Sequence, residues 1–275
     1  MPTVRGGNRT AVVNIEAVMT RGLRAWVLAA VALVMVVSGC ATPGGSGTGP
    51  DESVVLPTGP AQEMAAMRQV GGFVPPGWTF IEAPPVVVYS DGRAVADAHR
   101  VLTLTLPEVA ALVRELRRDL RGLGPTAKSS ESEFVADAPS TVLEVRSPAG
   151  GVQSVSAYAL GIVDGYPDAL VAARDRMAHL AERVTQQGTV YTGQRVRLVA
   201  DARSEGTVVM DWPAAVPVPP ANPAGVRVAD LEGDAAAALV SAIPPVQELD
   251  GPWPVLRLPD GSLVGVAWRY LLPDE

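Results

Sequence analysis

The stretch VVVYSDGRAVAD, residues 86–97, decides the fold of this 275-residue chain. It places Asp91-Gly92 between two short apolar runs, the first of them rich in valine. β-Branched and aromatic side chains favour strands, and glycine readily adopts the positive φ that a tight hairpin turn needs. The sequence therefore predicts a β-hairpin over 86–97, and Asp91 is interpreted as a turn residue rather than a catalytic acid.

An amphipathic helix is predicted just beyond this hairpin. Thr105 and Glu108 form a T-x-x-E capping box, in which the two residues satisfy backbone N–H groups at the helix start. Gly122 or Gly124 is expected to end the helix, since glycine often follows the last turn. The apolar positions at helical spacing are Val109, Leu112, Val113, Leu116, Leu120 and Leu123.

A second helix is predicted from Pro167-Asp168 to Gly188. Its apolar stripe consists of Leu170, Ala173, Met177, Leu180 and Val184. A shorter, alanine-rich helix is predicted at 235–243, where Pro244-Pro245 stops it. The sequence thus predicts two or three helices that each have one apolar face to bury.

Strands account for much of the remaining chain. Two more hairpins are predicted around Gly150-Gly151 and Asp260-Gly261, and Trp253, Trp268 and Tyr270 are expected to pin the last strand to the core. Residues 125–139 and 214–223 are expected to be a loop and a proline-rich extended segment. The predicted strands are 64–70, 86–89, 93–97, 101–105, 141–145, 152–160, 191–200, 207–210, 226–228, 255–258 and 263–270.

Because these strands come in hairpins with helices between them, the predicted fold class is α+β, with a mainly antiparallel sheet packed against two or three amphipathic helices. Residues 62–275 are expected to form this domain. The pattern loosens after residue 188, where a subdivision is an alternative to one continuous domain.

The N-terminal region has the pattern of a secretory signal. Arg21 and Arg24 precede thirteen apolar residues, 25–37, which is shorter than the roughly 20 residues of a transmembrane helix. Val37-Ser38-Gly39-Cys40 follows, and it resembles the lipobox of bacterial lipoproteins. The resemblance implies cleavage between Gly39 and Cys40, and a diacylglyceryl thioether on Cys40. The alternative is an uncleaved membrane anchor in which Cys40 is simply a small residue.

This interpretation divides the chain into three parts. Residues 1–39 are the predicted signal peptide, with Met19 as an alternative start. Residues 40–61 are the lipidated cysteine and a tether rich in Gly, Ser, Thr and Pro, which cannot bury a core. Residues 62–275 then form an extracytoplasmic domain that is attached to the cell membrane through the lipid on Cys40.

Charge and cysteine content exclude several classes of function. Residues 1–39 hold four of the 22 basic and one of the 29 acidic residues, which leaves a net charge of −10 on residues 40–275. Such a charge disfavours nucleic acid as a partner. Cys40 is the only cysteine, so neither disulfides nor thiolate metal sites are expected.

No motif identifies a catalytic or metal site. His99 and His179 belong to no ligand pair such as H-E-x-x-H, no G-x-S-x-G occurs, and no cofactor motif is present. Ser154 and Ser156 are expected to lie on a half-exposed strand. A carboxylate pair such as Asp97 with Asp137 stays open, since sequence does not give proximity. Catalytic activity therefore stays an open question, and the absence of these motifs favours a protein that is not an enzyme.

Several short segments resemble a family of exported proteins of actinobacteria. The segments that carry the resemblance are 71–76 (GGFVPP), 89–93 (YSDGR), 136–139 (ADAP), 158–161 (YALG) and 269–275 (RYLLPDE). The similarity spans most of residues 62–275. It implies an exported location and no catalytic residues.

Three functions remain after these observations. The first is a non-enzymatic binding module that recognises an envelope protein or a cell-wall component. The second is a carrier of a lipid or other apolar ligand, which requires a dry cavity of roughly 300–1,000 Å³ walled by Leu, Val and Ala. The third is a hydrolase with a dispersed site, which a cleft holding a carboxylate of raised pKa would favour. We expect the first.

Overall fold

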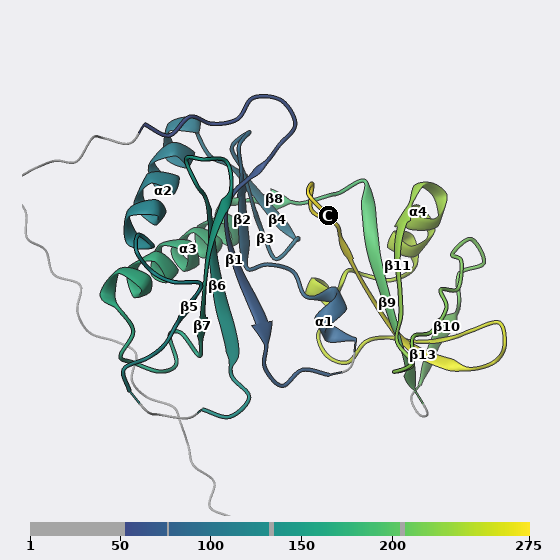
Figure 1. Cartoon of the computed structure of the whole chain (residues 1–275). Helices are drawn as coiled ribbons and strands as arrows, with labels where there is room; N and C mark the ends of the chain where they lie inside the picture. Colours follow the sequence, from purple (N-terminus) through teal and green to yellow (C-terminus); the bar gives the residue numbers. More distant parts are fainter. Residues whose placement is uncertain (1–52, 76, 132–134, 204–206) are drawn as a thin grey trace, which may run out of the picture. The chain divides into compact units, whose positions relative to one another are not determined.

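A computed structural model describes residues 53–75, 77–131, 135–203 and 207–275 (Figure 1). The predicted signal peptide, the lipobox with Cys40 and most of the tether lie outside these residues. Residues 50–275 form one compact unit. Within the described ranges, no helix has both the length and the apolar character needed to cross a membrane.

The first of two sheets has eight strands in the order β5-β7-β6-β1-β2-β3-β4-β8. All of its neighbours are antiparallel except β5 and β7. Its strands are β1 (Glu63–Gly71), β2 (Val86–Tyr89), β3 (Arg93–Ala96), β4 (Arg100–Thr103), β5 (Thr126–Ala127), β6 (Pro139–Arg146), β7 (Val152–Tyr158) and β8 (Thr189–Val190).

The hairpin predicted over 86–97 is confirmed and lies near the middle of this sheet. Strands β2 and β3 pair with Val87 opposite Val95. Gly92 in the turn has φ of +93°, and a Cβ there would lie 2.5 Å from the carbonyl oxygen of Leu104. The position therefore requires glycine for both its conformation and its space.

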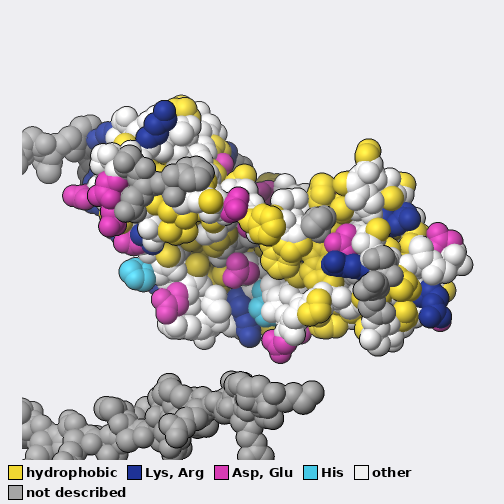
Figure 2. All heavy atoms as spheres, turned by 90° about the horizontal axis from the view of Figure 1, so that it is seen from below, with side chains coloured by type: hydrophobic (Ala, Val, Ile, Leu, Met, Phe, Trp, Pro, Cys, Tyr) yellow, Lys and Arg dark blue, Asp and Glu magenta, His cyan; other side chains and the backbone are white. Residues whose placement is uncertain are grey.

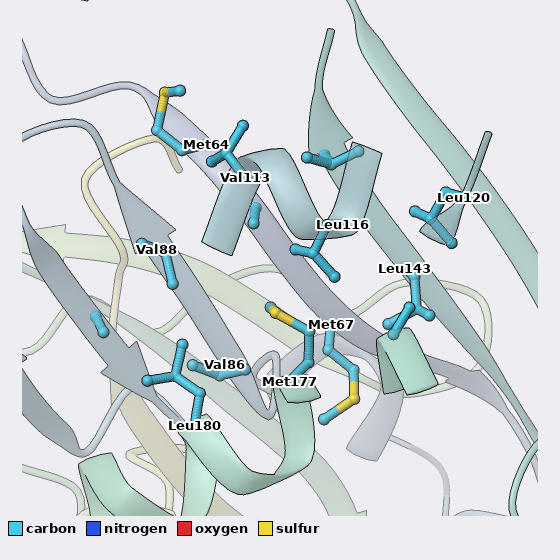
Figure 3. Packing of buried hydrophobic residues seen from close by; sticks show 14 of the residues in the cluster. Met64, Met67, Val86, Val88, Val113, Leu116, Leu120, Leu143, Met177 and Leu180 are labelled. Atoms are coloured by element: carbon cyan, nitrogen blue, oxygen red, sulfur yellow. The ribbon is translucent and has the colours of Figure 1, made fainter. Parts of the chain in front are cut away.

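Helices α2 (Leu106–Asp119) and α3 (Asp168–Gln187) cover one face of the first sheet (Figure 1). The Thr105–Glu108 capping box is present as predicted, but α2 ends at Asp119, before either predicted glycine. Figure 3 shows side chains of both helices, such as Leu116 and Met177, packed against those of β1, β2 and β6. All five predicted stripe residues of α3 are buried, as are Val109, Val113, Leu116 and Leu120 of α2.

The second sheet has five strands in the order β10-β12-β13-β9-β11. Helix α4 (Gly233–Ala242) covers one face, where Trp268 is buried and donates its indole N–H to the carbonyl oxygen of Ile243 over 2.9 Å. Trp268 thus anchors the last strand, as expected. The strands are β9 (Arg195–Arg203), β10 (Val208–Asp211), β11 (Arg227–Glu232), β12 (Val255–Arg257) and β13 (Leu263–Tyr270).

A short helix, α1 (Trp78–Ile81), lies in the connection between β1 and β2 but packs on the second sheet. Ile81 joins a small core with Val199 of β9 and Trp253. A 3-10 helix, η1 (Val246–Glu248), follows α4. The connection from β1 to β2 thus supplies part of the core of the second sheet, whose strands lie much later in the sequence.

The predicted α+β class with mainly antiparallel pairing is confirmed. Two pairs are parallel, β5 with β7 and β10 with β12. The predicted loop over 125–139 was wrong at both ends, since β5 and the start of β6 lie in it. The subdivision near residue 188 stays a prediction, although the sheets change between β8 and β9.

Candidate functional site

One pocket of the described residues has a volume of about 520 Å³ and is open to solvent. It is lined by parts of β1, the β3–β4 turn and the end of α3, and by α1 and η1, which pack on the second sheet. We call it the Asp97 pocket. Its lining consists of Gln69, Trp78, Ile81, Glu82, Ala83, Pro85, Ala96, Asp97, His99, Arg100, Thr185, Val246 and Gln247.

The turn between β3 and β4 places Asp97 at this pocket in an unusual backbone conformation. Asp97 and Ala98 have φ of 51° and 50°, and the N–H of His99 donates to the carbonyl oxygen of Ala96 over 2.9 Å. Two-residue turns of this kind favour Asn-Gly or Asp-Gly, because both central residues are left-handed. Such a conformation costs about 1–3 kcal/mol for a residue that is not glycine and occurs often at functional sites.

Contacts from two directions hold Asp97 in place. Its backbone N–H donates to the carbonyl oxygen of Pro84 over 3.1 Å, and its own carbonyl oxygen accepts from Nε2 of Gln247 over 2.7 Å. Its carboxylate has no hydrogen bond or ion pair with any described residue. Although Asp97 reaches the surface, burial by the surrounding protein raises its pKa.

A second carboxylate, that of Glu82, lines the same pocket at the end of α1. Glu82 is half-buried, and its backbone N–H donates to the carbonyl oxygen of Trp78 over 2.9 Å. Burial raises the pKa of this side chain too. Across the described ranges, its carboxylate likewise has no ion-pair or hydrogen-bond partner. The pocket therefore holds two carboxylates that nothing in the described protein compensates.

Two interactions fix α1, and with it Trp78, against the second sheet. The rings of Trp78 and Trp253 stack with centroids 6.2 Å apart and planes 24° apart. Gly77 precedes α1 with φ of +86°, and a Cβ on it would lie 3.3 Å from the ring of Trp253. The carbonyl oxygen of Ile81 accepts from Nε of Arg269 over 2.9 Å.

Arg269 is buried and forms an ion pair with the carboxylate of Glu275. Its Nη1 and Nη2 atoms each lie 2.7 Å from one carboxylate oxygen of Glu275. Burial acts to raise the pKa of Glu275, but hydrogen bonds from Arg269 and from the backbone N–H of Leu272 outweigh it, so the pKa is lowered. This fork-shaped pairing positions α1 through the bond to Ile81.

A further ionic cluster lies on β1 and β6, outside the Asp97 pocket. Arg68 contacts Glu63 at 2.5 Å and Glu144 at 2.7 Å. Burial raises the pKa of Glu63 to about 7, while Arg68 opposes the shift. Nearby, the hydroxyl of Tyr89 donates to Asp274 over 2.5 Å. Since these groups satisfy one another, we assign the cluster a structural role.

A smaller pocket of about 320 Å³ lies between α2 and α3. Leu112 and Leu180 contribute apolar surface, and His179, which is exposed, lies on its α3 side. Ion pairs link the two helices, such as Arg176 with Glu115 at 2.8 Å. This pocket and the Asp97 pocket both carry charged side chains, unlike the dry cavity that an apolar-ligand carrier requires.

The structure separates most of the residues that the sequence singled out. His99 and Asp97 line the same pocket, but Asp137 lies before β6, where its carbonyl oxygen accepts from the N–H of Phe73. Asp137 lines neither the Asp97 pocket nor the pocket between α2 and α3. Ser154 and Ser156 are half-buried on β7, as expected, and no metal-binding cluster occurs in the described ranges.

Three further lining residues, Trp78, Glu82 and Gln247, were not predicted from the sequence. They come from a four-residue helix and a single 3-10 turn, which are too short to produce a periodic pattern. Comparison with protein-family models, with curated proteins and with solved structures found no match for this chain.

Proposed function

We propose that the protein is a lipid-anchored extracytoplasmic binding module, without catalytic activity, that recognises an envelope protein or a cell-wall component in the Asp97 pocket. In this proposal, the lipid on Cys40 attaches the protein to the membrane. The observation that carries the binding role is the pocket itself, in which polar side chains from separate elements converge without partners in the described protein.

Glu82 and Arg100 are partly buried, and partly buried polar groups normally have a hydrogen-bond partner. An open pocket on which a few polar groups converge is the usual form of a binding site. The left-handed Asp97 supports the same interpretation, because backbone strain is retained where it positions a functional group. Together these features favour recognition of a polar ligand at this place over any other part of the described surface.

The alternatives are less well supported. An apolar-ligand carrier needs a dry cavity, whereas Glu82, Asp97 and Arg100 line the Asp97 pocket. A hydrolase needs a nucleophile beside a base, and the hydroxyl of Thr185 instead donates to the carbonyl oxygen of Ala181 within its own helix. The raised pKa values of the two carboxylates keep the hydrolase as the second alternative.

The proposed tether suits a module that works above a membrane. A flexible Gly- and Ser-rich chain has a root-mean-square length of about 5–6 Å times the square root of its residue number. Val54 and Leu56 already pack against the core of the first sheet, so the proposed flexible tether comprises residues 40–53, with a length of about 20 Å on average. Such a tether would let the Asp97 pocket reach ligands outside the lipid surface.

Replacement of Cys40 tests the anchor. We expect Cys40→Ala to abolish acylation, so that the precursor stays uncleaved or the protein is released from membranes. Ser46→Ala, in the tether, serves as the matched control. Fractionation of cells and metabolic labelling with a fatty acid measure the outcome, and a Cys40→Ala protein that fractionates and migrates like the parent contradicts the anchor.

Cross-linking in living cells tests the binding role. The Asp97→Asn and Glu82→Gln variants should lose the cross-linked species that the parent forms, because each removes a carboxylate acceptor from the pocket. Asp211→Asn is the control, since that side chain is 82% exposed and lies on the edge strand β10. Unchanged cross-linking in both pocket variants contradicts the proposed function.

A further inference from the structure

We propose that the Asp97 pocket binds a saccharide, through Trp78, Glu82, Asp97, Arg100 and the two glutamines of its lining. This inference rests on the proposed function and names the chemical class of its ligand. It depends on three properties of the lining: its hydrogen-bonding groups, its aromatic residue and its charge.

The hydrogen-bonding groups suit hydroxyl ligands. A sugar hydroxyl donates one hydrogen bond and accepts others, so a sugar ring needs donors and acceptors close together. Glu82 and Asp97 supply acceptors, Arg100 supplies donors, and Gln69 supplies both. Each of these planar groups presents two polar atoms side by side, which matches the spacing of neighbouring hydroxyls on a ring.

The polar groups of the lining are also available to a ligand. Among the described residues, the carboxylates of Glu82 and Asp97, the Arg100 guanidinium and the Gln69 amide form no hydrogen bond or ion pair. Gln247 uses only its amide nitrogen, on the carbonyl oxygen of Asp97. The bond fixes its side chain beside Asp97 and leaves its amide oxygen as an acceptor. The pocket is thus arranged for a ligand that replaces water at several polar atoms at once.

The aromatic residue supplies the apolar part of the site. A sugar ring has C–H groups on its faces, and these bury apolar area when they pack against an indole ring. Trp78 lines the pocket, is half-buried, and is held by stacking on Trp253. Seen from below, apolar side chains gather near the middle of the molecule (Figure 2).

The charge of the lining disfavours other small ligands. Two carboxylates repel phosphate and other anions, and Arg100 adds a donor of opposite charge to the same lining. An apolar ligand would leave all of these groups unsatisfied. A neutral ligand with many hydroxyls satisfies both kinds of charged group without a counter-charge of its own.

Calorimetry on the intact, detergent-solubilised protein tests the proposal. The probes are the β-1,4-linked tetrasaccharide of N-acetylglucosamine and oligosaccharides of galactan and arabinan. We expect at least one probe to bind, and Trp78→Ala, Asp97→Asn and Glu82→Gln each to weaken that binding at least tenfold. Asp211→Asn should bind like the parent. If Trp78→Ala fails to fold, Trp78→Phe keeps an aromatic ring and should retain most of the affinity.

A second measurement separates failure of this inference from failure of the proposed function. The protein is retained on isolated cell walls, and the oligosaccharides or the free tetrapeptide L-Ala-D-Glu-L-Lys-D-Ala are added as competitors. Release by oligosaccharides supports a saccharide ligand. Release by the tetrapeptide alone overturns it and leaves the binding module intact. Retention that Asp97→Asn and Glu82→Gln leave unchanged overturns both proposals.

Discussion

Arg269 connects the end of β13 to the helix that carries Trp78. The arginine is 2% exposed, and its guanidinium contacts the carboxylate of Glu275 twice at 2.7 Å and the carbonyl oxygen of Ile81 at 2.9 Å. We predict that Arg269→Ala destabilises the protein strongly, because it leaves both acceptors in place without their donor.

The size of the effect follows from these two acceptors. Removing one partner of a buried ion pair costs about 3–5 kcal/mol. The lower end applies here because the side chain of Glu275 is 22% exposed. The carbonyl oxygen of Ile81 adds about 1–3 kcal/mol when it loses a hydrogen bond in a buried position. We therefore expect a loss of about 4–6 kcal/mol in the free energy of unfolding, and a Tm lower by about 8–24 °C.

The loss should also depend on pH in a defined direction. In the parent, the pKa of Glu275 is lowered, so its contribution is present above the ordinary pKa of 4.5 and disappears as the pH falls through the lowered value. In Arg269→Ala, only the N–H of Leu272 and the charge of Arg197 still oppose the effect of burial on Glu275, so the pKa of Glu275 rises and its protonation at low pH relieves the variant. The difference between parent and variant should therefore be large at pH 7 and smaller near pH 3.

Urea unfolding at pH 7 and pH 3 measures this difference. Arg257→Ala is the control, because Arg257 is 54% exposed and its pair with Asp211 spans 3.8 Å, so its loss should stay below about 0.5 kcal/mol. A double-mutant cycle with Glu275→Gln should show a coupling of about 1 kcal/mol or more. An Arg269→Ala variant that unfolds like Arg257→Ala refutes the reasoning.

Two further predictions concern the first sheet and its helices. Leu116→Ala, in the buried stripe of α2, should cost about 2–5 kcal/mol, measured as a shift in the urea midpoint, whereas an unchanged midpoint would show that Leu116 is not part of the core. Burial raises the pKa of Glu63 to about 7, so the stability linked to it is present below the ordinary value of 4.5 and is lost as the pH rises through about 7. Glu63→Gln should therefore unfold at a urea midpoint that changes less between pH 4.5 and pH 8 than the parent's, and parallel curves would contradict this sign.

Local pattern was enough to predict the elements that hold the fold. The Asp91-Gly92 turn, the Thr105–Glu108 capping box and the apolar stripe of α3 each depend on residues within a few positions of one another, and all three are present. Helix α2 ends at Asp119, and Gly122 has φ of +77° in the turn that follows, so the glycine lies beyond the helix end rather than at it. The parallel pairs were not predicted because strands that no hairpin joins leave no local signal of their pairing.

The candidate site was much less predictable, for a physical reason. Asp97 was named only as half of a pair with Asp137, and its real neighbours are Gln247 and Glu82, which come from other elements. A hydrogen bond such as that between Gln247 and Asp97 spans 150 positions of the sequence. No spacing rule covers such a distance, so the site exists only once both sheets are in place.

The position of α1 has a consequence for how the chain is made. Its residues Trp78 and Ile81 pack against Val199 and Trp253, which are synthesised much later. At about 5–20 residues per second, roughly 6–24 s separate the synthesis of Ile81 from that of Val199. Throughout that interval neither Val199 nor Trp253 is present to cover Trp78 and Ile81, so this part of the core forms only after most of the chain has been made.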